Sequence, residues 1–134
     1  MARARINDEV GRAALGVVRA VAEGSADVAA SLREPQDIAV DRTTLALAVR
    51  YSLQVLAELA PGGTVEVRVP PYAAVQCVEG PKHTRGTPPN VIETDASTWL
   101  ALATGALSWG DARAAGRVQA SGQRADLSGL LPIV

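Results

Sequence analysis

The residues that could do covalent chemistry are the single cysteine, Cys77, and the single histidine, His83. In a thiol–imidazole pair the histidine would deprotonate the cysteine, and a third side chain would orient the ring. Cys77 shares an alternating apolar phase with Val75, which predicts a strand face turned inward, where a cysteine behaves as a small inert hydrophobe. No third residue is identifiable. We therefore expect no catalytic residues and a protein that is not an enzyme.

A group of basic residues follows the second predicted strand. Lys82, His83 and Arg85 sit together in a stretch from Glu79 to Asn90 that is rich in proline and glycine, and Arg68 lies on a nearby predicted strand. These cations could hold a carboxylate or phosphate at the mouth of a pocket. The alternative is an ordinary solvated loop tip. A structureless connection of about twelve residues is uncommon unless it has a function, which favours the first interpretation.

Acidic residues near that loop give no clear catalytic pair. Glu79, Glu93 and Asp95 could supply carboxylates for acid–base chemistry, but Asp95 is better explained as a helix cap. One histidine excludes a histidine-rich metal cluster, and one cysteine excludes an internal disulfide. No glycine-rich phosphate loop follows a strand. We expect no metal and no cofactor.

Composition describes one ordinary globular unit. The chain has 134 residues, of which 48% are hydrophobic and 20% charged, and its formal net charge is −1. That charge gives no electrostatic reason to expect nucleic acid or an anionic membrane as a partner. No apolar run follows the basic residues near the start, and none approaches the roughly 20 residues of a membrane span. We expect a cytoplasmic protein. Because there is no phenylalanine, alanine, valine and leucine must fill its core.

Four helices follow capping residues. Asn7, Asp41, Asp95 and Ser108 each precede a segment with apolar residues at helical spacing. The predicted helices run from Asp8 to Gly24, from Arg42 to Ala60, from Ala96 to Thr104 and from Trp109 to Ala115, with a further short helix over Ala26 to Leu32. The second has a wide apolar face, which favours burial against a sheet.

The remaining regular segments alternate between apolar and polar residues. Val65, Val67 and Val69 predict a half-buried strand, and Pro70-Pro71 separates it from a second strand over Tyr72 to Val78. The short connection predicts an antiparallel hairpin. Further strands are expected at 91–93 and 117–121, and a helical turn or two at 125–131. The residues expected to be largely buried are Val49, Leu53, Leu56, Val65, Val67, Val75, Cys77, Trp99, Leu100 and Val118.

One of these segments resembles the hallmark of sterol-carrier-protein domains. Asp95-Ala-Ser-Thr-Trp-Leu-Ala-Leu-Ala-Thr-Gly105, followed by Ala106-Leu107-Ser108, is similar to that family's acid-capped helix and short second helix. The stretch from Gly116 to Gly122 resembles the family's last strand, and 125–131 its C-terminal helix. The stretch from Val65 to Glu93 looks like an actinobacterial branch of the family, whose activity is uncharacterised. The resemblance covers roughly 41–134.

This resemblance implies an α+β fold with a twisted, mainly antiparallel sheet of about four to five strands and helices packed on one face. An apolar cavity would lie between them, and 1–40 would be an N-terminal helical extension and connector to the domain at 41–134. The residues expected to line the cavity are Trp99, Leu102, Leu107, Trp109, Leu127 and Leu130, with Lys82, His83 and Arg85 at its mouth. The tryptophans could equally be the largest members of an aromatic-poor core.

The expected function is therefore non-catalytic binding of a lipid-like or other apolar small molecule. Such a cavity needs little specific chemistry, because each buried CH₂ group contributes about 0.8 kcal/mol. The alternative is a homo-oligomeric, for example homodimeric, interaction protein or an enzyme accessory without a ligand cavity. An apolar surface on the first helix or at the sheet edge would serve that role.

Overall fold

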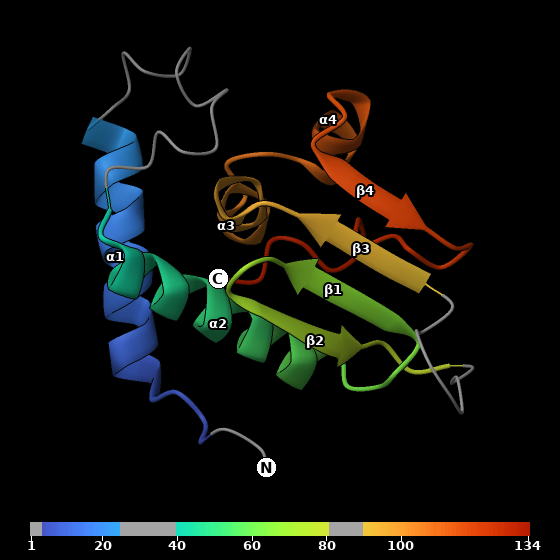
Figure 1. The fold of residues 1–134 in the computed structure, drawn as a ribbon, viewed down its shortest axis with the longest axis horizontal. Helices are drawn as coiled ribbons and strands as arrows, with labels where there is room; N and C mark the ends of the chain where they lie inside the picture. The colour runs from blue at the N-terminus through green and yellow to red at the C-terminus, as the bar shows by residue number, and fades with distance from the viewer. Residues whose placement is uncertain (1–3, 25–39, 81–89) are drawn as a thin grey trace.

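A four-stranded sheet with helices against one face forms the centre of this α+β protein (Figure 1). The structure, a computed structural model, describes residues 4–24, 40–80 and 90–134. Its elements in chain order are α1 (Asp8–Gly24), α2 (Arg42–Leu59), β1 (Val65–Val69), β2 (Ala73–Cys77), β3 (Asn90–Thr94), α3 (Ala96–Thr104), α4 (Trp109–Ala114) and β4 (Val118–Ser121). The short helix expected at 26–32 lies outside the described residues.

The strands are arranged in the order β2-β1-β3-β4. The hairpin prediction is confirmed, because β1 and β2 pair antiparallel with Val67 opposite Val75. β3 pairs antiparallel with β4, so two of the three pairings have this sense. The central pair, β1 and β3, is parallel, with Val67 opposite Ile92. β2 and β4 are therefore the two edges of the described sheet.

The alternation in β1 sets which face of the sheet is buried. Val65, Val67 and Val69 are fully buried beneath the helices, whereas Glu66 and Arg68 point to the other face, where the Arg68 Nε donates to the Glu66 carboxylate. The predicted register is thus confirmed. Of the ten residues expected in the core, nine are buried, and the exception is Val75, which is half-buried. Both Val75 and Cys77 lie on the edge strand β2, and Cys77 is fully buried whereas Val75 keeps solvent contact.

The predicted caps hold three of the helix starts in place. The Asp41 carboxylate accepts from the Thr44 amide at 2.9 Å, and the Asp95 carboxylate accepts from the Thr98 amide at 2.8 Å. The Ser108 hydroxyl accepts from the Asp111 amide at 3.1 Å. Each bond satisfies a donor that the first helical turn would otherwise leave unpaired.

The C-terminal segment differs from the expected apolar helix. The amides of Leu130 and Leu131 both donate to the carbonyl of Leu127, at 2.9 and 3.2 Å, which makes a single turn. Gly129 and Pro132 explain why the turn does not extend, because these are the two residue types with the lowest helix propensity. The segment continues across α3, where the amide of Ile133 donates to the carbonyl of Ala103 at 2.9 Å.

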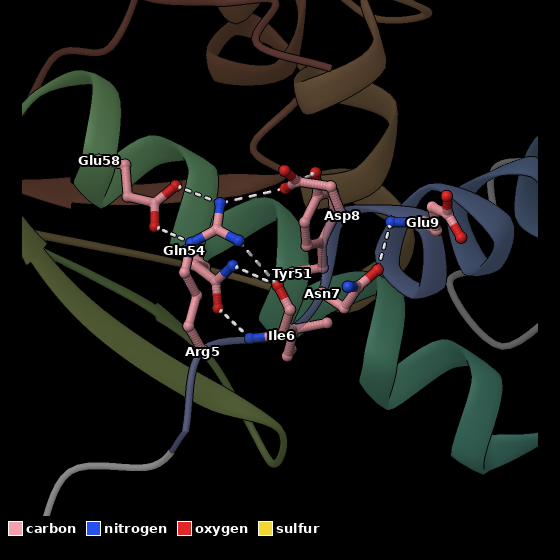
Figure 2. Close-up of polar contacts among 8 residues, drawn as sticks. All are labelled: Arg5, Ile6, Asn7, Asp8, Glu9, Tyr51, Gln54 and Glu58. Carbon is pink, nitrogen blue, oxygen red and sulfur yellow. Dashed lines mark hydrogen bonds and ion pairs between the residues drawn. The ribbon is translucent and has the colours of Figure 1, made fainter.

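A polar cluster joins the start of the chain to α2 (Figure 2). The Arg5 guanidinium reaches both the Asp8 carboxylate and the Glu58 carboxylate, and the Tyr51 hydroxyl donates to Asp8 at 2.8 Å. The Gln54 amide accepts from the backbone of Ile6 at 2.8 Å and donates back to it at 3.0 Å. With these two hydrogen bonds, the Gln54 side chain bonds the Ile6 backbone as the backbone of a neighbouring strand would. The hydrogen bond from Tyr51, followed by that from Arg5, lowers the pKa of Asp8.

We predict that Gly11→Ala destabilises the protein. A Cβ atom at Gly11 would lie 2.2 Å from the ring of Tyr51, which is buried between α1 and α2. Either the ring or α1 must move, and such overpacking costs about 1–3 kcal/mol. Urea unfolding measures the change. Gly16→Ala is the matched control, since nothing lies within 4 Å of its Cβ position, and the gain in helix propensity should raise stability by about 0.5–1 kcal/mol. Equal behaviour of the two variants would contradict this packing of α1.

Candidate ligand-binding region

The residues expected to line an apolar cavity converge on the covered face of the sheet. Trp99 and Leu102 lie on α3, Trp109 begins α4, and Leu127 comes from the C-terminal segment, and all four are buried. Leu107 and Leu130 are half-buried and pack against the same cluster. The structure thus gathers these six side chains around one apolar core.

Trp99 is the largest fully buried side chain of the described chain. Its indole Nε1 donates to the Ser52 hydroxyl at 2.8 Å, and that hydroxyl lies 2.8 Å from the carbonyl of Ala48 on the preceding turn of α2. The bond joins α2 to α3 inside the core. A buried indole N–H needs such an acceptor, because an unpaired one would lose its hydration without compensation.

The interior around these side chains is filled. Trp99 and Leu127 are 0% exposed and Leu102 is 1% exposed. A side chain that faced a hollow large enough for a water molecule would keep accessible surface, so no such hollow touches these three residues. In this structure the apolar region is a packed core, and a ligand could occupy it only if one of its elements moved aside.

The structure describes only some of the charged residues singled out from the sequence. Lys82, His83 and Arg85 lie outside the described residues. Arg68 is paired with Glu66 on the open face of the sheet. Asp95 serves as the cap of α3, as expected, and the Thr98 hydroxyl also donates to it at 2.9 Å. Glu79 and Glu93 are exposed.

Cys77 lies at the end of β2 with its side chain fully buried. Burial disfavours the thiolate and raises the pKa of Cys77 to about 11. A thiol with that pKa is protonated at neutral pH and is a poor nucleophile. The structure thus places Cys77 in the apolar core, in line with the interpretation of its position in the sequence.

An open cavity that sequence reasoning missed lies at the other edge of the sheet. Its volume is about 570 Å³. The lining residues are Val91 and Glu93 of β3, Arg113 of α4, and all four residues of β4, Val118, Gln119, Ala120 and Ser121. No sequence motif marks this set, because its members become neighbours only through strand pairing.

Two features are not found among the described residues. No helix of these segments is both long and apolar enough to cross a membrane. Across 4–24, 40–80 and 90–134, no three His, Cys, Asp or Glu side chains gather where they could hold a metal ion.

One sheet with helices over a single apolar face, capped by the Asp95 helix and its short successor, defines a sterol-carrier-protein-like domain. A family model described as Bacterial SCP ortholog matches residues 41–133. The chain belongs to that family. No curated protein matches it.

We predict that Ser52→Ala costs about 1–3 kcal/mol, because it leaves the buried Trp99 N–H without its acceptor. Thermal unfolding measures the loss, and the tryptophan emission spectrum reports whether the indole environment changes. Ser121→Ala is the control, since this exposed serine makes no side-chain hydrogen bond with another described residue. Equal stability of both variants would show that the indole finds another partner.

The raised pKa of Cys77 predicts a pH effect with a definite sign. Between about pH 9 and 11 the unfolded chain loses the thiol proton while the folded chain keeps it. The contribution of this group to stability is therefore present below pH 9 and lost as the pH rises toward 11. We expect unfolding free energies of the wild type to fall more steeply over this window than those of Cys77→Ala. If the unfolding free energies of the wild type and of Cys77→Ala fall equally steeply with pH, the burial of the thiol is contradicted.

Proposed function

We propose that this domain binds a lipid-like or other apolar small molecule, without catalysis, between the sheet and its helices. The support is membership of a sterol-carrier-like family together with an apolar core closed on one side by an irregular segment. Because the core is filled around Trp99 and Leu127, the ligand would enter by displacing part of that closure.

The observation that carries the proposal is the make-up of the C-terminal segment, 125–134. It places one fully buried leucine, Leu127, in the core. Leu130, Leu131, Ile133 and Val134 are half-buried and pack against the same core. Its described links to other elements include two bonds to the Ala103 carbonyl and one from Arg19 to the backbone oxygen of Val134 at 3.0 Å. A single turn with few hydrogen bonds opens more easily than a helix.

The energies allow an exchange between this segment and a ligand. Fully burying a leucine is worth about 1.5–3 kcal/mol, whereas a chain of twelve buried CH₂ groups gains roughly 10 kcal/mol. The ligand must also offset its lost freedom of motion, which costs on the order of 4–15 kcal/mol. A long acyl chain could thus replace Leu127 at modest net affinity, while a short one could not.

The basic group Lys82, His83 and Arg85 remains our proposed contact for an anionic end of the ligand. A charge-assisted hydrogen bond contributes about 1.5–3 kcal/mol. Neither catalysis nor a cofactor is needed for this role, and we propose that it operates in the cytoplasm.

A second candidate function is self-association through α1. Val10 is 49% and Val17 46% exposed on a helix whose opposite side packs on the core, and Ala13 and Ala20 lie exposed between and beyond them. These four residues follow one another at intervals of three and four positions, which is the spacing of a helix–helix interface. Native mass spectrometry of freshly purified protein separates the candidates, since it reports a bound small molecule and the number of chains together.

We predict that dodecanoic acid changes the tryptophan emission of the protein and binds more tightly than dodecanol. Added salt should narrow the gap between them, because it screens the charged end. Replacing Lys82, His83 and Arg85 by alanine together should remove most of the preference for the acid, and Arg12→Ala is the control for a lost exposed charge. If no acyl chain changes the tryptophan emission, the carrier function is excluded. Equal affinities for the acid and the alcohol would exclude a role of the basic group in binding.

The closing role of the C-terminal segment has its own test. Leu127→Ala should tighten acyl binding severalfold, since the ligand would displace a smaller side chain; Leu131→Ala serves if that variant does not fold. Leu59→Ala is the control, because this leucine at the end of α2 is 63% exposed. Weaker binding in the Leu127 variant, with folding intact by circular dichroism, would show that Leu127 forms part of a wall.

A further inference from the structure

The cavity beside β4 lies along the outer edge of the sheet. Val91 and Glu93 of β3 lie opposite Ser121 and Gln119 of β4, so these four lining residues share the open face of the sheet, and Val118 and Ala120 alternate with them along β4. β4 pairs with β3 on one side only. In Figure 1 it is the last strand of the sheet, and of the described elements only α4 stands beside it, near its start. The cavity therefore lies over the outermost pair of described strands, next to an edge that has no neighbouring strand among the described residues.

Four polar side chains in this cavity make no side-chain hydrogen bond or ion pair with another described residue. Glu93 and Gln119, which face each other across the β3–β4 pair, are exposed and make no side-chain hydrogen bond or ion pair with another described residue. Ser121 likewise makes none, and Arg113 makes no hydrogen bond or ion pair, although its charge lies near enough to Asp126 to help lower the pKa of that carboxyl. Polar side chains elsewhere on the protein are often paired, as Glu66 is with Arg68 on the same open face. The β4 edge thus holds both an anion and a cation available to a ligand.

Within the strand, only the short length of β4, four residues, limits pairing at this edge. Strand edges in soluble proteins are commonly guarded by a charged side chain or a proline within the strand. β4 reads Val-Gln-Ala-Ser and contains neither. The charged residues of the cavity lie on other elements: Glu93 is on the neighbouring strand β3, and Arg113 is on the last turn of α4.

We propose that the free edge of β4 binds an extended peptide segment of a partner protein by strand addition. The partner's backbone would pair with β4, an acidic side chain would meet Arg113, and a basic one would meet Glu93. Backbone pairing supplies affinity in this binding mode and side-chain contacts supply selectivity. A cavity of about 570 Å³ beside a four-residue strand of roughly 13 Å matches a short segment rather than a whole domain surface.

The occupant is a mixed-charge peptide rather than a single-sign ligand, because the two unpaired charges have opposite signs. An anionic surface would meet Glu93, and a cationic one would meet Arg113. The site lies mainly on the open face, whereas the apolar core lies beneath the opposite face, and the two share Val118 and Ala120. Strand addition needs no acyl ligand, so this proposal can be tested independently of acyl binding.

The test uses the full chain and a set of blocked hexapeptides of valine and threonine that carry one lysine and one glutamate in every arrangement. We expect at least one arrangement to shift the amide NMR signals of Val118–Ser121 and to protect two alternate amides of β4 from hydrogen exchange. Arg113→Ala should weaken that peptide about fivefold, as should Glu93→Gln, which is the scale of an exposed ion pair. Arg12→Ala on α1 is the control and should leave binding unchanged.

Backbone pairing is tested separately from charge. A version of the best peptide that is N-methylated at alternate residues keeps its side chains but loses donors on one edge, and it should not bind. Three results would overturn the proposal: equal binding of the N-methylated peptide, binding of free glutamate or lysine as tight as that of the peptide, and protection of β4 by self-association alone. Absence of binding by every hexapeptide at millimolar concentration would also overturn it.

Discussion

The hydrogen bond between the Trp99 indole and the Ser52 hydroxyl determines how the helical layer of this protein is built. It joins α3 to α2 through Trp99, the largest fully buried side chain of the described residues, in a core made mainly of valine, leucine and alanine. Small side chains allow close approach of helix to sheet, but they specify relative orientation poorly. A buried donor with one available acceptor adds that specification, because any other arrangement leaves the N–H unpaired. The remaining core contacts can then be apolar and unspecific.

Those parts of the fold that depend on local sequence were predictable. The alternation in β1, the caps at Asp41, Asp95 and Ser108, and the turn after Val69 are encoded within a few residues, and the structure confirms each. The resemblance to sterol-carrier proteins also holds over 41–133. Features that depend on where an element lies in the folded domain could not be predicted from the sequence. Val75 has the same apolar phase as Cys77 and lies on the same edge strand, yet Val75 is half-buried and Cys77 is fully buried.

The N-terminal helix shows the same limit. Its amphipathic pattern predicted a helix, yet nothing local revealed that Gln54 would bond the backbone of Ile6 or that Gly11 would lie against the ring of Tyr51. Both contacts join residues about forty positions apart. The bonds also explain why the small glycine is needed at this point: the Tyr51 ring can reach Asp8 with its hydroxyl only by passing close over the backbone of α1.

The candidate site residues were chosen from the sequence because their types are rare or reactive. Strand pairing instead brings residues together by their position in the chain, whatever their type. Cys77 is a core residue, as expected, and the interior that the tryptophans were expected to line is filled around Trp99. The unpaired polar groups that the described structure brings together, Glu93, Arg113, Gln119 and Ser121, belong to common residue types and are spread over nearly thirty positions. They meet because β3 and β4 pair in one register and α4 leads directly into β4. A sheet with one face buried has solvent on the other face and at its edges, so polar groups that serve binding are retained there without cost to the core. This division separates the apolar interior, where we propose that a small molecule binds, from the polar edge, where we propose that another chain binds.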